Sequence, residues 1–319
     1  MNQQQLKENA EQIKICKKWL GTAKSDFEAA KNLYEHENYP QSVFSLQQSI
    51  EKTIKAYGIF MGVKESDLKN KFRHDTLKIY EHHLTGFLEK SKSFSETLKA
   101  HPELKSIPML NELDYDDLAI EMSDAKDEFQ NIKSSAEDMT KTTRKIESCI
   151  NKAIKLFENE KISIKGLSKI KLSDRQFNEI KRFMFENLNE ISKLKKQELP
   201  ELKEIEKLTP SYFQRLFSET FSYLIRALSV YSALLYLNLI VYNKVSSTRY
   251  PENKTPQQIY NINSPIIKRF RDIQKIHQDC FLKIEDILNE QEKLTKKYQN
   301  ETTNPTNSQA RPPTKSGSL

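Results

Sequence analysis

Apolar residues recur at intervals of three and four over much of this chain, which is the spacing that places them on one face of a helix. The clearest run lies in residues 40–61 and consists of Val43, Leu46, Ile50, Ile54, Tyr57 and Met61. Residues 1–37 hold a similar run, made of Leu20, Ala23, Phe27, Ala30 and Leu33. Because only a short polar turn separates the two runs, the pattern predicts two antiparallel helices.

The same periodicity predicts two further helices in the first half of the chain. A polar loop, residues 63–73, leads to a third helix that begins near Leu77 and lasts to about Ala100. The His-Pro pair that follows disfavours helical geometry. A fourth helix begins at Leu110 and ends at Phe157. We therefore predict an antiparallel four-helix up-down bundle over residues 1–158.

A second helical domain is predicted over residues 173–298, after a short basic linker at residues 159–172. Hydroxyl residues followed by Asp or Pro mark three helix starts, at Ser173, Thr209 and Ser264, because such residues cap the first turn. The last helix is expected to run from Ser264-Pro265 to about Tyr298, after a polar loop at residues 244–263. Residues 299–319 lack apolar periodicity and are predicted to be a disordered tail.

Composition agrees with long helices. Only 6 glycines and 11 prolines occur among 319 residues, 30% of which are charged, and such a scarcity of turn residues argues against a β-sandwich or barrel. The predicted fold class is therefore all-α.

The most apolar stretch, Tyr212–Tyr242, has two interpretations. Residues 224–242 approach the length of a membrane span. Arg226 and Asn238 lie inside that run, however, and both would be costly in lipid. We predict a central buried helix, with a membrane anchor as the weaker alternative, so a membrane partner is not expected.

The cysteines and the first residues indicate the compartment. Cys16, Cys149 and Cys280 stand far apart and in no paired spacing, which suggests neither a disulfide framework nor a zinc site. The first residues show no basic segment followed by an apolar one, as a secretory signal would. We expect a cytoplasmic protein.

Charge is distributed unevenly. Residues 1–160 hold 24 basic against 27 acidic side chains, whereas the remainder holds 27 against 17, so the second part carries a formal charge of +10. This balance favours a polyanion such as RNA as a partner of the second part. An acidic stripe in the first part, formed by Asp117, Glu121, Asp124 and Glu128, is interpreted as a solvated helix face, with a cation or basic-partner site as the alternative.

One string resembles a known family. The residues Gln47-Gln48-Ser49-Ile50-Glu51-Lys52-Thr53-Ile54-Lys55-Ala56-Tyr57, followed by His74-Asp75, resemble the HEPN family, helical domains of prokaryotic toxin and defence systems. The resemblance covers roughly residues 15–158. It implies that Arg73, His74 and Asp75 bind a nucleotide or a partner protein, such as an antitoxin or a nucleotidyltransferase.

A second spacing suggests catalysis. Arg271 and His277 resemble the Arg-(four to six)-His motif of ribonuclease-active HEPN domains. In such a pair the imidazole moves a proton from the 2′-OH of RNA and the guanidinium holds the phosphate. A second HEPN unit usually completes such a site, which implies either that residues 173–298 are a second HEPN-like unit facing the first or that the chain forms a homodimer. The alternative is that His277, which lies on an apolar stripe, is a packed core residue.

The sequence therefore predicts a toxin or defence protein that acts on RNA, as a metal-independent endoribonuclease through Arg271 and His277. The alternative is a non-catalytic module that binds a nucleotide or a partner protein through Arg73, His74 and Asp75. The chain has no phosphate-binding loop, Rossmann glycine run, HExxH helix or Gly-x-Ser-x-Gly elbow, so neither a cofactor nor a metal is expected.

Overall fold

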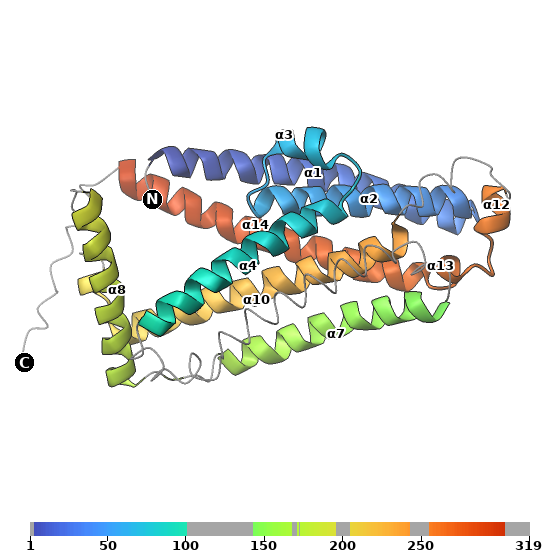
Figure 1. The fold of residues 1–319 in the computed structure, drawn as a ribbon. Coiled ribbons are helices and arrows are strands. Elements are labelled where there is room, and N and C mark those ends of the chain that lie inside the picture. The colour runs from blue at the N-terminus through green and yellow to red at the C-terminus, as the bar shows by residue number, and fades with distance from the viewer. Residues whose placement is uncertain are drawn as a thin grey trace, which may run out of the picture. The chain divides into compact units, whose positions relative to one another are not determined.

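The computed structural model describes residues 3–100, 143–167, 171, 173–195, 205–242 and 255–303. All the regular secondary structure in these residues is helical, which confirms the all-α class (Figure 1). Contacts divide the chain into two units, residues 1–74 with 243–319 and residues 75–242. The domain boundaries predicted at residues 158 and 173 stay a prediction, as does the predicted tail beyond residue 303, which lies outside the described residues.

The first unit is built on three long helices that contact one another. They are α1 (Gln3–Glu35), α2 (Tyr39–Phe60) and α14 (Phe270–Thr303). The apolar runs predicted on α1 and α2 form its core, where Leu46 and Ile50 are fully buried. Ion pairs join Lys17 to Glu292 and Lys24 to Glu285, so α1 and α14 run antiparallel.

The connection after α2 is more ordered than the polar loop that the sequence predicted. It contains α3 (Glu65–Asp67) and a π-helical turn, η1 (Leu68–Phe72). Leu68 and Phe72 are buried and anchor this segment to the core. The prediction of a loop was therefore wrong, because two apolar side chains in a polar stretch suffice to fold it onto the bundle.

The approach to α14 also differs from the prediction. A short helix, α12 (Pro256–Ile259), lies within the predicted loop and is held by a capping box between Thr255 and Gln258. The predicted start at Ser264-Pro265 opens only α13 (Pro265–Lys268), and α14 begins anew at Phe270 and continues to Thr303. The chain breaks helical geometry at Arg269, which the apolar periodicity does not reveal.

The second unit contains four described helices. They are α4 (Leu77–Ala100), α7 (Thr143–Leu167), α8 (Asp174–Lys195) and α10 (Pro210–Val241). The predicted caps are present, since Ser173 Oγ accepts from the Gln176 N–H and Thr209 Oγ1 accepts from the Tyr212 N–H, both at 3.3 Å. Helix α7 runs through residues 159–167, which the sequence predicted as linker, because its buried face continues to Leu167.

The four-helix up-down arrangement stays a prediction. Helices α1 and α2 fall in the first unit, whereas α4 and α7 fall in the second. The predicted helix over residues 110–157 is described only from residue 143 onward. The acidic stripe, at residues 117–128, lies outside the described residues.

Among the described helices, α10 is long and apolar enough to cross a membrane by length and composition. Most of its apolar window is buried, and α10 packs mainly against α7. Asn238 is 4% exposed, and its Oδ1 accepts a hydrogen bond from the Thr76 hydroxyl at 2.9 Å. This packing favours a buried helix, because the protein itself supplies a partner for the amide oxygen.

Candidate functional site

The predicted catalytic residue His277 lies in the core of the first unit. Its side chain is 0% exposed, and its ring meets Phe27 and Phe281 at centroid distances of 5.5 and 4.4 Å. Burial lowers the pKa of His277 to about 3, so the imidazole is neutral near pH 7. Arg271 is exposed. The structure therefore does not bring Arg271 and His277 to one solvent-reachable surface.

Hydrogen bonds define the tautomer of His277. The Thr53 hydroxyl donates to the carbonyl oxygen of Ser49 at 2.8 Å, so its oxygen accepts from His277 Nε2–H at 3.0 Å. The Nδ1 atom then carries a lone pair, and no described residue donates a hydrogen bond to it. This is the packed core histidine that the sequence analysis named as the alternative.

The predicted binding residues Arg73 and His74 lie on the surface of the first unit. Arg73 follows η1 with φ of +45°, a backbone conformation that non-glycine residues rarely adopt. The side chain of His74 is 84% exposed. Asp75 falls in the second unit, where its carboxylate lies 3.5 Å from the Lys78 ammonium. Of the predicted triplet, Arg73 and His74 therefore remain together in one unit.

His74 is anchored by a buried carboxylate on α2. Glu51 Oε1 lies 3.0 Å from His74 Nδ1 and 2.6 Å from Lys55 Nζ, and the side chains of Glu51 and Lys55 are each only 8% exposed. The Lys55 ammonium also lies over the ring of Trp19, 5.6 Å from its centroid. We call Trp19, Glu51, Lys55, Arg73 and His74 the His74 site.

This geometry orients the imidazole of His74. A carboxylate oxygen only accepts hydrogen bonds, so Nδ1 must be the donor to Glu51. Nε2 is then the ring atom that a ligand would meet, as a lone pair in the neutral ring and as a donor in the imidazolium. The site can thus accept a hydrogen bond or, after taking up a proton, bind an anion.

Two carboxylates in and beside the His74 site are paired with lysines. Besides Glu51 with Lys55, Glu65 lies 3.1 Å from Lys69. The hydrogen bond from Lys69 holds the pKa of the Glu65 carboxyl below its usual value, and a hydrogen bond from Trp19 adds to this. No residue that the structure describes pairs with Arg73. Arg73 and the exposed Lys18 and Lys71 are cations near this site for which the described residues supply no ion pair.

Sequence reasoning missed Glu51 and Lys55 as site residues. The pair stands at i and i+4, a spacing that ordinarily indicates a solvated ion pair on a helix surface. The available signal was that both residues directly follow buried positions of the apolar run, Ile50 and Ile54. On a helix covered on several sides, such neighbours are buried too.

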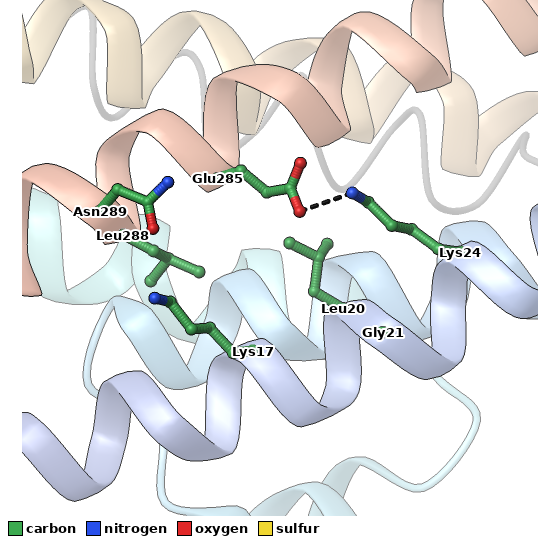
Figure 2. A pocket seen from close by; sticks show the side chains of 7 residues that line it. All are labelled: Lys17, Leu20, Gly21, Lys24, Glu285, Leu288 and Asn289. Carbon is green, nitrogen blue, oxygen red and sulfur yellow. Dashed lines mark hydrogen bonds and ion pairs between the residues drawn. The ribbon is translucent and has the colours of Figure 1, made fainter.

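A groove between α1 and α14 is one of the hollows of the first unit. It encloses about 230 Å³ and is lined by Lys17, Leu20, Gly21, Lys24, Glu285, Leu288 and Asn289. Figure 2 shows Leu20 and Leu288 between the two helices, with Lys24 linked to Glu285 across the groove. Lys17 pairs with Glu292 in the same way. Both groove lysines are therefore already neutralised, which makes the groove a poorer anion site than the surface around Arg73 and His74.

No three His, Cys, Asp or Glu side chains gather at a candidate metal site within the described ranges.

In a comparison with known proteins, the first part of the chain matches a family model. Residues 16–162 match the model of the HEPN domain. This range contains the whole His74 site and excludes Arg271 and His277. No curated protein and no solved structure matches the chain.

Proposed function

We propose that this protein binds RNA or a nucleotide through its His74 site, in a toxin or defence setting, because residues 16–162 match the model of the HEPN domain. A HEPN domain indicates, in general terms, an RNA-related nuclease or a nucleotide-binding function. The proposal extends to a partner protein, an antitoxin or a nucleotidyltransferase, and to a second copy of the chain, on the strength of the family resemblance.

The observation that supports the proposal is the buried anchor beneath an exposed histidine. Keeping Glu51 and Lys55 charged at 8% exposure is expensive, because each ion loses its hydration. The packing of His74 offsets little of this desolvation cost, since 84% of its side chain is exposed to solvent. An imidazole that a buried carboxylate orients and that faces solvent can bind a ligand from solution. The strained backbone at Arg73, next to His74, points to the same surface.

Trp19 makes the proposal testable without a label, because it is the only tryptophan of the chain and belongs to the site. We expect AMP, or a short oligoribonucleotide with a 5′-phosphate, to change its fluorescence on titration. His74→Ala is expected to weaken binding at least tenfold, since a hydrogen bond to a charged group contributes about 1.5–3 kcal/mol. Isothermal titration calorimetry measures the same constants independently.

His36→Ala is the matched control. His36 is also exposed, also in the first unit, and its Nδ1 lies 2.8 Å from the carbonyl oxygen of Asn32, a neutral group. This variant should bind like the wild type. Equal affinities of the wild type and His74→Ala, or no binding of either ligand by the wild type, would contradict the proposal.

A ribonuclease that uses Arg271 and His277 remains the second candidate, favoured by the spacing of the two residues. It requires the imidazole to reach a 2′-OH, whereas the ring of His277 is enclosed by protein. We therefore expect Arg271→Ala, a change at an exposed position, to leave RNA degradation at the wild-type level. The measurement is gel analysis of total RNA incubated with either protein and EDTA. A loss of metal-independent cleavage in Arg271→Ala would restore the ribonuclease interpretation.

A further inference from the structure

A hollow of about 420 Å³ lies in the first unit and shares no residue with the His74 site. Its walls come from the turn between α1 and α2 and from α12 with the turn that follows it (Figure 1). Pro40 and Tyr260, which line it, are buried, and α12 contacts α2, so the inner part of the hollow belongs to the packed core. We call it the Glu37 hollow. Its other lining residues are Glu37, Asn38, Tyr39, Gln257, Asn261 and Ile262.

Glu37 occupies a backbone position that suits glycine. Helix α1 ends in a Schellman motif, in which the Glu37 N–H donates to the carbonyl oxygen of Tyr34 at 3.0 Å and the Asn38 N–H donates to that of Leu33 at 2.8 Å. The φ angle of Glu37 is +57°, a left-handed conformation that strains any residue with a side chain. The turn itself would therefore be more stable with glycine. No described residue forms an ion pair with the Glu37 carboxylate, so the carboxylate is open to a ligand.

Two amides of the hollow also have unused hydrogen-bonding groups. Asn38 precedes α2 at a position where asparagine ordinarily caps the helix, but its side chain makes no capping hydrogen bond. Within the described part of the chain, nothing bonds to the side chain of Asn38 or of Gln257. The Asn261 amide, by contrast, donates to the carbonyl oxygen of Gln258 at 2.9 Å. The hollow therefore offers a carboxylate and two amide oxygens as acceptors.

The ring of Tyr39 is held in place beside these acceptors. It lies 5.6 Å from the ring of Tyr34, which in turn stacks on Phe270 at 4.5 Å. Tyr39 is nonetheless partly exposed, so a ligand can reach its ring. Loss of hydration and the negative charge of Glu37 raise the pKa of the Tyr39 hydroxyl, which means that the carboxylate acts on this residue. Ile262, which is 56% exposed, adds apolar surface to the hollow.

The charge of the hollow selects a cation. Of the described residues that line it, only Glu37 is charged. Lys31, His36 and Lys268 are exposed on flanking segments, as is Glu35, but none of these four lines the hollow. An anion would meet a negative wall, whereas a guanidinium suits it in three ways. It is positive, its fork of N–H groups matches carboxylate and amide oxygens, and its plane stacks on a tyrosine ring.

We propose that the Glu37 hollow binds an arginine side chain of a partner protein, which donates hydrogen bonds to Glu37 and lies against the ring of Tyr39. An apolar neighbour of that arginine packs on Ile262. This inference goes beyond the proposed function, because the surface and the chemistry of its ligand differ from those of the His74 site. It also gives Glu37 a purpose that its strained backbone position lacks within the turn.

The probe is a capped peptide, Ser-Leu-Arg-Leu-Ser, that carries an uncharged coumarin dye, and fluorescence anisotropy at low salt measures its binding to the full chain. We expect the peptide to bind. The same peptide with citrulline should bind at least tenfold more weakly, because citrulline keeps the shape of arginine without its charge. Lysine in place of arginine should weaken binding several-fold, since the ammonium lacks the planar fork that stacks on Tyr39 and donates two parallel hydrogen bonds.

Variants separate binding from a structural role. Glu37→Gln should weaken binding of the arginine peptide at least tenfold, and Tyr39→Leu several-fold. Glu37→Gly should lose the binding while its melting temperature stays at or above that of the wild type, because glycine relieves the strained φ. Glu28→Gln, at an exposed position of α1 outside the hollow, is the matched control and should bind like the wild type.

Three results would overturn the inference. The arginine and citrulline peptides could bind equally well, or the wild type could bind neither of them. Guanosine also presents adjacent N–H donors to a carboxylate, so its binding in place of the arginine peptide would make the hollow a base site instead. His74→Ala should bind the arginine peptide like the wild type, so the failure of this inference leaves the proposed function standing.

Discussion

Replacing Glu51 with alanine is expected to lower the free energy of unfolding by about 3–5 kcal/mol, because the change leaves the Lys55 ammonium buried without its counterion. Lys55 would keep only the Trp19 ring, since its carboxylate partner is gone and its side chain is 8% exposed. Urea denaturation followed by far-ultraviolet circular dichroism measures the effect. His74 loses its anchor in the same variant, so nucleotide binding should fall together with stability.

Two further variants test the cause of this loss. The double replacement Glu51→Leu with Lys55→Met removes both charges and keeps the volume, so it should recover most of the stability. Glu11→Gln removes one partner of an exposed pair with Lys14 and should change nothing measurable. If Glu51→Ala destabilises no more than Glu11→Gln does, the Glu51–Lys55 pair is not buried and the site needs another explanation.

The sequence predicts helices well because their evidence is local. The run from Val43 to Met61 and the caps at Ser173 and Thr209 depend on residues within a turn or two of each other, and the structure has helices at these places. The partners of the helices are not local. Nothing in the periodicity of α14 shows that it contacts α1 and α2, which precede it by more than two hundred residues. The grouping of helices therefore had to come from the structure.

The candidate site was predictable in part for a related reason. Arg73 and His74 were identified through the family resemblance, which depends on neighbouring residues. The burial of Glu51 and Lys55 is a tertiary effect. It depends on residues of α1 and of the segment after η1, among them Trp19 and His74, that pack against α2. Spacing alone cannot separate a buried ion pair from a solvated one. For His277 the apolar stripe predicted a buried ring and the motif spacing predicted a catalytic one. The ring is buried in the core.

His277 makes a second strong prediction, namely that the protein loses stability as pH falls below 6.5. Burial lowers the pKa of His277 to about 3 in the folded state, whereas an unfolded histidine has a pKa near 6.5. Between these values the unfolded chain binds a proton at this position and the folded chain does not. The contribution of His277 to the free energy of unfolding is therefore fully present above pH 6.5. Between pH 7 and pH 5 this contribution falls by about 2 kcal/mol.

His277→Leu isolates this contribution. The variant gives up the hydrogen bond to Thr53, whose hydroxyl keeps its bond to the carbonyl oxygen of Ser49, so we expect a loss of about 1–2 kcal/mol at pH 7. Leucine cannot bind a proton, so the difference in unfolding free energy between pH 7 and pH 5 should shrink by about 2 kcal/mol relative to the wild type. His36→Gln, at an exposed histidine, should leave that difference unchanged. An unchanged pH dependence in His277→Leu would mean that the ring reaches solvent, and with it that a role in catalysis is open again.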